Sequence, residues 1–257
     1  MNLKLTARMQ IIADFINEED VVADVGTDHG YIPLWLVLNK KCKRAILTDV
    51  NQGPLDKAKA NSEKYLANKG MIDMRLGSGI EVLEYSEADA VIIAGMGGLL
   101  IRDILSQNQK KTSSIKKFIL QPRNNSYELR KWILSTLSGY RITEERIVKE
   151  GKKFSEVFCL VKNECITASD LERIEKADNL RLLHDISDDL SLEIPCMYLI
   201  NPDDTVKEYI NKRILTEERI VDLIRHSGRS EESSHRLTMT EKHLSEIKKM
   251  AELCNIS

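Results

Sequence analysis

The sequence of 257 residues has few aromatic side chains, no closely paired cysteines and no long apolar run. Aromatic residues make up 5% of it, too few for the base-stacking sheet of a protein that binds single-stranded nucleic acid. No apolar stretch approaches the ~20 residues of a membrane span, and the amino terminus lacks the apolar core of a secretory signal. We therefore expect no membrane partner.

Cysteine and histidine are too scattered for a disulfide framework or a metal centre. The five histidines form no HExxH or HxH motif, so we predict no metal. The cysteines are odd in number and include no CxxC pair, which excludes a zinc ribbon and fits a reducing cytoplasm. They stand at Cys42, Cys159, Cys165, Cys196 and Cys254.

Charge is unevenly distributed along the chain, although the net charge is only −2. Residues 1–163 hold 25 Lys and Arg against 20 Asp and Glu, whereas residues 164–257 hold 13 against 20. Two ordinary solvated surfaces would explain this division. A first domain that faces a polyanion, followed by an acidic second domain, would explain it as well.

Apolar segments alternate with helical patterns over the first 163 residues. Largely apolar strands between helices indicate a parallel sheet covered on both faces. Segments 140–148 and 155–161 flank a polar turn and predict an antiparallel hairpin at one sheet edge. We therefore predict an α/β fold with a doubly wound, mostly parallel, Rossmann-like sheet. Its strands are expected at 21–25, 45–48, 71–76, 88–94 and 118–120, and its helices at 5–16, 31–38, 53–67, from 99 onward, and at 127–137.

From about residue 164 the pattern is helical, and we place a domain boundary between 163 and 164. Apolar residues follow a 3–4 spacing from 206 to 224 and heptad positions from 237 to 254. With the polar segment 227–234 between them, they predict an antiparallel coiled-coil hairpin, and a plain helical pair packed on the first domain fits equally well. Residues 186–202 contain two prolines and are predicted to form an irregular connector.

The run VVADVGTDHG (21–30) carries the most information about function. Asp24 ends a strand and Gly26 lets the backbone turn, as at the ligand-binding corner of a doubly wound sheet. The run lacks the GxGxxG set that cradles pyrophosphate, which disfavours a nicotinamide cofactor, and Asp28 would repel a phosphate. A cationic ligand without phosphate, such as S-adenosylmethionine, suits this corner. Asp24 taken alone would also fit a helix cap.

The ends of four further strands carry candidate binding residues. The acidic residue after the second strand can accept both ribose hydroxyls, or cap a helix. The serine and glycine after the third can approach an adenine ring, or form a flexible turn. The glycine-rich run after the fourth lets backbone lie against a ligand, and the amides after the fifth can read a base edge or cap a helix. These residues are Asp49; Ser78 and Gly79; Ala94, Gly95, Met96 and Gly97; and Gln121, Pro122 and Asn124.

Together the motifs resemble the bacterial tRNA (adenine(22)-N(1))-methyltransferase family, a class I group that depends on S-adenosylmethionine. The resemblance covers residues 1–163 and rests on the helix start at 5–8, DVGTDHGY (24–31), IAGMGG (93–98), LQP (120–122) and EGKKFSEV (150–157). It implies methylation of the N1 ring nitrogen of adenine 22 in the D-arm of tRNA, with S-adenosylhomocysteine as the second product. Ser78 stands where we expect the family to have Asp.

Carried over residue by residue, the resemblance assigns the candidates at 24, 26, 49, 78, 79 and 94–97 to the cofactor. It assigns Arg8, Asp28, His29 and Tyr31 to the acceptor side. We expect Asp28 either to stabilise the cationic product or to accept a proton from the exocyclic amine, Tyr31 to stack on the base and Arg8 to hold a phosphate. His29 as an ordinary helix-start residue and Tyr31 as core packing are the simpler alternatives.

Two lysines on the hairpin turn, Lys152 and Lys153, are candidate tRNA contacts or a solvated turn. We expect tRNA as the partner and a monomeric enzyme. Two other functions fit the same motifs. One is a small-molecule methyltransferase with the same cofactor site, and the other is a protein that binds RNA or cofactor without catalysis.

Overall fold

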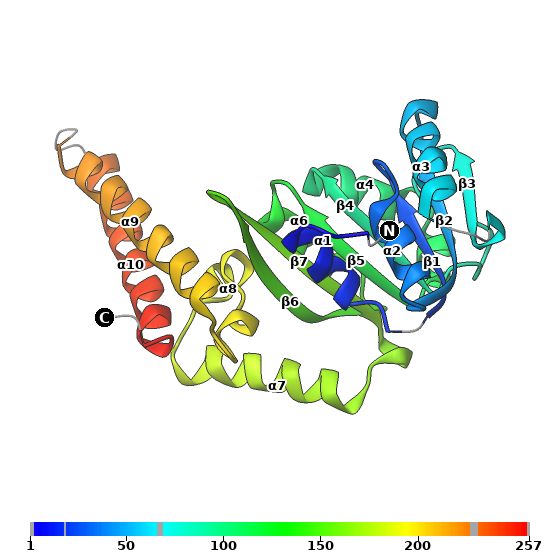
Figure 1. Cartoon of the computed structure of the whole chain (residues 1–257). Coiled ribbons are helices and arrows are strands. Elements are labelled where there is room, and N and C mark those ends of the chain that lie inside the picture. Colours follow the sequence, from blue (N-terminus) through cyan, green and yellow to red (C-terminus); the bar gives the residue numbers. More distant parts are fainter. Residues whose placement is uncertain (1–2, 18, 66–68, 227–230, 256–257) are drawn as a thin grey trace. The chain divides into compact units, whose positions relative to one another are not determined.

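The computed structural model describes residues 3–17, 19–65, 69–226 and 231–255. The chain divides into two compact units, Met1–Asp170 and Leu171–Ser257 (Figure 1). The sequence-based boundary after residue 163 falls just beyond the last strand and stays a prediction. Across the described ranges we find no helix that combines the length and the apolarity of a membrane span.

The first unit is built on one seven-stranded sheet with the order β3-β2-β1-β4-β5-β7-β6. Strands β1 to β5 run parallel, whereas β7 runs antiparallel to both β5 and β6. The predicted fold class is confirmed, including the hairpin that closes one edge. The strands are β1 (Glu19–Val25), β2 (Cys42–Asp49), β3 (Ile72–Leu76), β4 (Ala90–Met96), β5 (Lys117–Pro122), β6 (Tyr140–Glu150) and β7 (Lys153–Lys162).

Helices cover both faces of the sheet, so its central strands are apolar on both sides. In β4, Ala90 and Ile92 join one buried cluster with α1, α2 and α3, while Val91 and Ile93 join a second cluster with α4 and α6. Successive side chains of a strand point to opposite faces, which explains this division. The helices are α1 (Ala7–Asp14), α2 (Tyr31–Leu38), α3 (Gln52–Tyr65), η1 (Lys69–Met71), α4 (Gly98–Gln107), α5 (Gln109–Ser114) and α6 (Ser126–Thr136).

The strand order places the functional motifs at one edge of the sheet. After β1 the chain moves to β2 on one side, and it later returns to β4 on the other side of β1. Such a reversal opens a crevice at the carboxyl ends of the strands. The acidic and glycine-rich segments that follow β1, β2, β3, β4 and β5 therefore lie along this edge.

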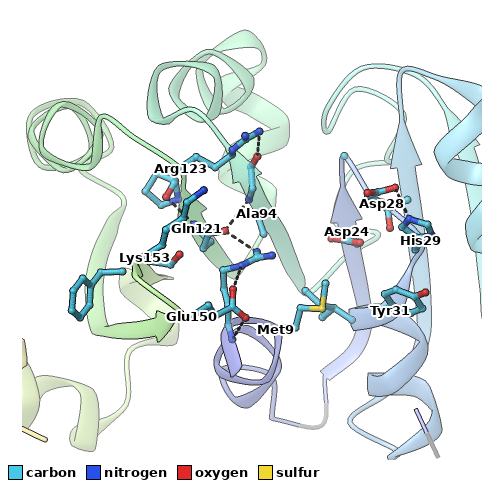
Figure 2. Close-up of a pocket in the computed structure, with 18 residues that line it drawn as sticks. Met9, Asp24, Asp28, His29, Tyr31, Ala94, Gln121, Arg123, Glu150 and Lys153 are labelled. Carbon is cyan, nitrogen blue, oxygen red and sulfur yellow. Dashed lines mark hydrogen bonds and ion pairs between the residues drawn. The ribbon is translucent and has the colours of Figure 1, made fainter. Parts of the chain in front are cut away.

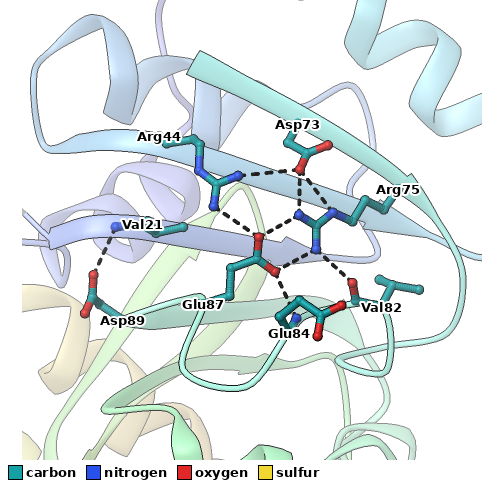
Figure 3. A network of polar contacts seen from close by, with 8 residues as sticks. All are labelled: Val21, Arg44, Asp73, Arg75, Val82, Glu84, Glu87 and Asp89. Carbon is teal, nitrogen blue, oxygen red and sulfur yellow. Dashed lines mark hydrogen bonds and ion pairs between the residues drawn. The ribbon is translucent and has the colours of Figure 1, made fainter. Parts of the chain in front are cut away.

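A network of ion pairs holds the segment that follows β3 (Figure 3). The Arg75 guanidinium donates to Asp73 at 2.6 Å, to both oxygens of Glu87 at 2.6 and 2.7 Å, and to the carbonyl of Val82 at 2.8 Å. Arg44 of β2 adds a hydrogen bond to Glu87 at 3.1 Å. The network ties the chain between Gly77 and Glu87 back onto β2 and β3.

The second unit is helical, as predicted. Its two long helices, α9 (Asp204–His226) and α10 (Glu231–Leu253), lie side by side (Figure 1). Arg225 of α9 pairs with Glu241 of α10, and Glu218 of α9 pairs with Lys248 of α10, as expected for an antiparallel hairpin. The coiled-coil geometry stays a prediction. The helices from the end of β7 onward are η2 (Asn163–Cys165), α7 (Ala168–Leu183), α8 (Asp188–Glu193), η3 (Cys196–Leu199), α9 (Asp204–His226) and α10 (Glu231–Leu253).

Two predictions for this unit were wrong. Residues 186–202 contain two helical segments, α8 and η3, because buried Ile186, Leu190 and Ile194 give this stretch a core of its own. Within the polar segment 227–234, residues 231–234 form the first turn of α10. Glutamates at 231 and 232 favour that position since they face the positive end of the helix dipole. Residues 227–230 lie outside the described residues.

Candidate functional site

A cavity of about 640 Å³ opens at the carboxyl edge of the sheet, between the ends of β1, β4 and β5 (Figure 2). The first turn of α1 and the hairpin of β6 and β7 complete its wall. A cavity of this size accommodates a ligand of a few hundred daltons. The sequence-predicted residues that line it are Arg8, Asp24, Gly26, Asp28, His29, Tyr31, Ala94, Gly95, Gln121, Pro122 and Lys153.

The turn after β1 is held by the neighbouring strand and requires glycine. The backbone amides of Gly26 and Thr27 both donate to the carbonyl of Thr48, at 2.8 and 3.1 Å. Gly26 has a φ of +72°, and a Cβ placed on it would lie 1.9 Å from the terminal methyl of Met96. The positive φ therefore favours glycine at this position, and a side chain here would also displace the flexible end of Met96.

Two buried polar groups form the floor of the cavity. Asp24 is 7% exposed, and burial raises the pKa of its carboxyl to about 6, opposed by the neighbouring Thr27 side chain and assisted by the charge of Asp49. Thr27 is 2% exposed, and its hydroxyl, although near enough to Asp24 to lower the pKa of that carboxyl, completes no hydrogen bond among the described residues. Buried polar groups are normally satisfied, so this pair indicates a ligand with a cationic group and hydrogen-bonding atoms.

The same floor fits the cofactor predicted from the sequence. S-adenosylmethionine carries an ammonium and a sulfonium, for which a buried carboxylate is a suitable neighbour. Gly95 has a φ of +74°, and no atom lies within 4 Å of the position that a Cβ would take, so its backbone is open to a ligand. Asp24, Thr27 and Gly95 are the residues that would hold its charged end.

Several predicted cofactor residues lie on the same edge but outside the cavity wall. Asp49 is the last residue of β2, and its carboxylate accepts a hydrogen bond from the Asn51 backbone amide at 2.7 Å, just before α3 begins. Its charge nevertheless acts on Asp24. Ser78 is exposed after β3, next to Gly79, which has a φ of +55°. Among the other candidates, Met96, Gly97, Asn124 and Lys152 are also absent from the wall.

One rim of the cavity carries Asp28, His29 and Tyr31. His29 has a positive φ of 66°, and its carbonyl accepts a hydrogen bond from the Asn61 amide at 2.9 Å. Its ring stacks on Tyr31 with 5.4 Å between centroids and 4° between planes. Asp28 is exposed and lies 3.4 Å from the His29 ring nitrogen Nε2 and 3.6 Å from the Lys57 ammonium. The rim therefore presents a carboxylate beside a flat aromatic surface.

The opposite wall contains Arg8, Gln121 and a residue that the sequence analysis missed, Glu150. Arg8 donates from Nε to Glu150 at 3.3 Å and from Nη1 to the Gln121 side-chain oxygen at 2.9 Å. That oxygen also accepts the Gly95 amide, and Nε2 of Gln121 donates to the Pro122 carbonyl. A contact from Gln121 to a base would have to use its second Nε2 hydrogen.

Further wall residues that the sequence analysis did not assign are Met9, Thr27, Ile32, Arg123, Glu150, Phe154 and Ser155. Thr27 and Glu150 lie within quoted motifs, so their proximity to a site could have been suspected. Their particular roles depend on burial and on partners far away in sequence. Within the described residues, no group of three His, Cys, Asp or Glu side chains has the arrangement of a metal site.

A doubly wound sheet with a buried acidic residue and glycine turns at its switch point defines a Rossmann-like protein that binds a nucleoside-type ligand at this edge. Comparison with known proteins identifies the family. The chain belongs to the methyltransferase domain family, whose model matches residues 5–158.

Individual relatives agree with this family. The chain is 40% identical over 155 residues to the tRNA (adenine(22)-N(1))-methyltransferase of Bacillus subtilis, a match that covers 60% of this chain and 64% of the relative, less than two thirds of its length. The crystal structure of the B. subtilis M1A22 tRNA methyltransferase TrmK superimposes with a TM-score of 0.78 at 28% identity, covering 97% of this chain and 100% of the other. The TrmK of M. capricolum, solved with S-adenosylhomocysteine, gives 0.73 at 25%, covering 97% and 98%. The resemblance drawn from the sequence is confirmed.

Proposed function

We propose that this protein transfers a methyl group from S-adenosylmethionine to the N1 nitrogen of adenine 22 in the D-arm of tRNA. The single observation that supports this most is the cavity, in which the buried Asp24 and the unpartnered Thr27 hydroxyl face the rim of Asp28, His29 and Tyr31. The 40% identity to the B. subtilis enzyme of that name supports the same substrate.

The cofactor is held by residues of four strand ends. Asp24 and the glycine turns at 26 and 95 receive the charged amino-acid end, and Asp49 receives the ribose hydroxyls. Ser78 and Gly79 border the adenine, where a serine hydroxyl accepts a weaker hydrogen bond from the exocyclic amine than an aspartate would. When bound, S-adenosylmethionine supplies the electrophilic methyl group.

On the acceptor side, the protein positions a nucleophile that already exists. The adenine N1 has a free lone pair, so the wall and rim need only align it with the methyl group at about 3–3.5 Å and exclude water. Tyr31 replaces the stacking that the base loses when it leaves the folded tRNA. Asp28 stabilises the positive charge that develops on the methylated ring.

Contacts to the tRNA backbone come from cationic groups near the cavity mouth, and contacts to a base edge come from the amides after β5. Lys153 lines the cavity, and Lys152 is exposed beside it on the hairpin turn. Pro122, Gln121 and Asn124 belong to the end of β5 and the turn after it, beside the glycine run. A cationic mouth attracts the phosphate backbone and makes binding salt-dependent. We further propose that the enzyme acts as a cytoplasmic monomer.

The deciding experiment is methyl transfer from labelled S-adenosylmethionine to unmodified transcribed tRNA. The control is the same tRNA with adenine 22 replaced by guanine. Label in the first transcript and none in the second is the expected result. Label in neither, together with measurable cofactor binding, would contradict the proposal and favour a small-molecule acceptor or a binding protein. Label in both would contradict the proposed position.

A further inference from the structure

Glu150 connects the hairpin of β6 and β7 to α1 at the cavity wall. It is the last residue of β6, and its carboxylate accepts the Arg8 backbone amide at 3.2 Å and the Arg8 Nε at 3.3 Å. Burial would raise the pKa of Glu150, but the hydrogen bonds from Thr6 and Arg8 outweigh it and hold the pKa below its ordinary value. Glu150 is therefore a charged acceptor at neutral pH.

The contacts continue from Arg8 across the cavity wall to the glycine turn at the end of β4. Arg8 Nη1 donates to the side-chain oxygen of Gln121 at 2.9 Å, and the same oxygen accepts the Gly95 amide at 3.1 Å. Gln121 is itself fixed because its Nε2 donates to the Pro122 carbonyl at 2.8 Å. One continuous series of hydrogen bonds thus joins β6, α1, β5 and the end of β4.

Building on the proposed function, we propose that Glu150 is a positioning residue for methyl transfer. It holds the Arg8 guanidinium against the acceptor side of the cavity and, through Gln121, fixes the Gly95 amide. Within the described residues Arg8 Nη2 has no protein hydrogen bond, so this held guanidinium keeps a donor for an acceptor phosphate or base.

The chemistry of this series of hydrogen bonds predicts which substitution at position 150 interrupts it. A glutamine at position 150 keeps the size of the side chain but only one acceptor oxygen, so it can serve one of the two Arg8 donors while its NH₂ group faces the other. The guanidinium then loses its charge-assisted partner and its fixed orientation. A loss of alignment of this kind lowers the rate of a two-substrate reaction far more than it weakens binding of the cofactor.

The experiment compares Glu150→Gln with Glu144→Gln, a matched change on the same strand. Glu144 pairs with Arg146 and is not part of the cavity wall. We expect Glu150→Gln to lower kcat/KM for tRNA about 10- to 100-fold, with a much smaller loss of affinity for S-adenosylmethionine, because Gly95 borders the cofactor site, and with little change in Tm. Glu144→Gln should behave like the unsubstituted enzyme. Equal activity of the two variants would overturn the proposal.

A double-mutant cycle separates positioning from a general structural effect. If Glu150 acts through Arg8, then Arg8→Met with Glu150→Gln should be no less active than Arg8→Met alone. Full additivity of the two losses would show that Glu150 acts by another route. A parallel fall in cofactor affinity and Tm would show a structural role only.

Nuclear magnetic resonance spectroscopy tests the inference without tRNA. In the isotope-labelled full chain, the Arg8 Nε–H and Gly95 amide resonances should both shift in Glu150→Gln and stay in place in Glu144→Gln. An unchanged Gly95 resonance would contradict the inference even in an active enzyme. If the unsubstituted protein methylates no tRNA, the proposed function fails, and these two resonances still decide whether Glu150 fixes Arg8 and Gly95.

Discussion

At the scale of single residues, the buried carboxylate of Asp24 makes cofactor binding depend on pH. A cationic ligand requires the ionised form, and burial raises the pKa of Asp24 to about 6. The affinity for S-adenosylmethionine should therefore be constant above pH 7 and fall roughly tenfold per pH unit well below 6. Titration calorimetry between pH 5 and pH 8 measures this directly.

The same shift predicts the effect of Asp24→Asn on stability. Because the pKa of the folded state lies above the ordinary value of 3.8, ionised Asp24 destabilises the fold above pH 6, and this effect disappears as pH falls toward 4. Asp24→Asn should raise the free energy of unfolding by roughly 2 kcal/mol at pH 8 and by little at pH 4, while it removes cofactor binding. An equal gain at both pH values would contradict the assignment.

Substitutions at the rim should lower the rate of methyl transfer without weakening the binding of S-adenosylmethionine. Asp28→Ala and Tyr31→Ala remove the carboxylate and the stacking surface but leave the floor of the cavity unchanged. We expect kcat to fall about 100-fold or more, with the dissociation constant of S-adenosylmethionine within about twofold of its starting value. Asp56→Ala, at an exposed position of α3, is the control. Normal turnover by either rim variant would show that its assigned role is wrong.

Residue types and spacing were sufficient to place Asp24 and Gly95 at the carboxyl ends of their strands, where each is the second-last residue of β1 and β4. Glu150 could not be found in this way because its partner Arg8 lies 142 residues away in sequence. Thr27 was missed because an unpartnered hydroxyl is recognised only once its burial is known. Sequence patterns predict local geometry well. Contacts between segments that are distant in sequence become known only when the fold is known.

At the scale of elements, the alternation of apolar strands and helices predicted the first unit with small errors at the ends of elements. Strand β4 was expected at 88–94 and occupies Ala90–Met96. The hairpin was predicted because a polar turn stood between two alternating segments. The segment 186–202 was mispredicted because its helices are short and its prolines indicated loop, whereas Leu190 and Ile194 pack inside the unit.

The ion-pair network around Arg75 supports the loop that carries Ser78 and Gly79. Arg75→Met removes hydrogen bonds to Asp73, Glu87 and the Val82 carbonyl. We expect the free energy of unfolding to fall by about 2 kcal/mol. The KM for S-adenosylmethionine should rise while the KM for tRNA stays the same. Denaturant titration and steady-state kinetics measure the two effects.

The control for this change is Arg102→Met. Arg102 pairs only with its exposed neighbour Asp103 among the described residues, so its removal should alter neither quantity. A rise in both KM values for Arg75→Met would indicate general disruption and would contradict a specific effect on the cofactor loop.

At the scale of the whole molecule, the surplus of Lys and Arg in residues 1–163 should make tRNA binding sensitive to salt. The logarithm of the tRNA association constant should fall linearly with the logarithm of the salt concentration. Lys152→Ala and Lys153→Ala should each reduce that slope by about 1 if each contacts a phosphate. Filter binding at several KCl concentrations measures the slope.

Lys176→Ala, which removes an exposed ion pair with Glu172 in the second unit, serves as the control and should leave the slope unchanged. Cofactor binding should be insensitive to salt in every variant. A tRNA slope near zero in the unsubstituted protein would contradict the electrostatic model and point to a small-molecule acceptor.

The contact between Arg8 and Glu150 also has a consequence for the order in which the protein is made. Arg8 is synthesised before β1 to β5, and its partner at position 150 only after them. Closing so long a loop carries an entropic cost that local contacts do not offset, so this wall forms late in folding. A nascent chain that ends before β6 therefore lacks the closing wall of the cavity. The wall is completed when the hairpin pairs with β5.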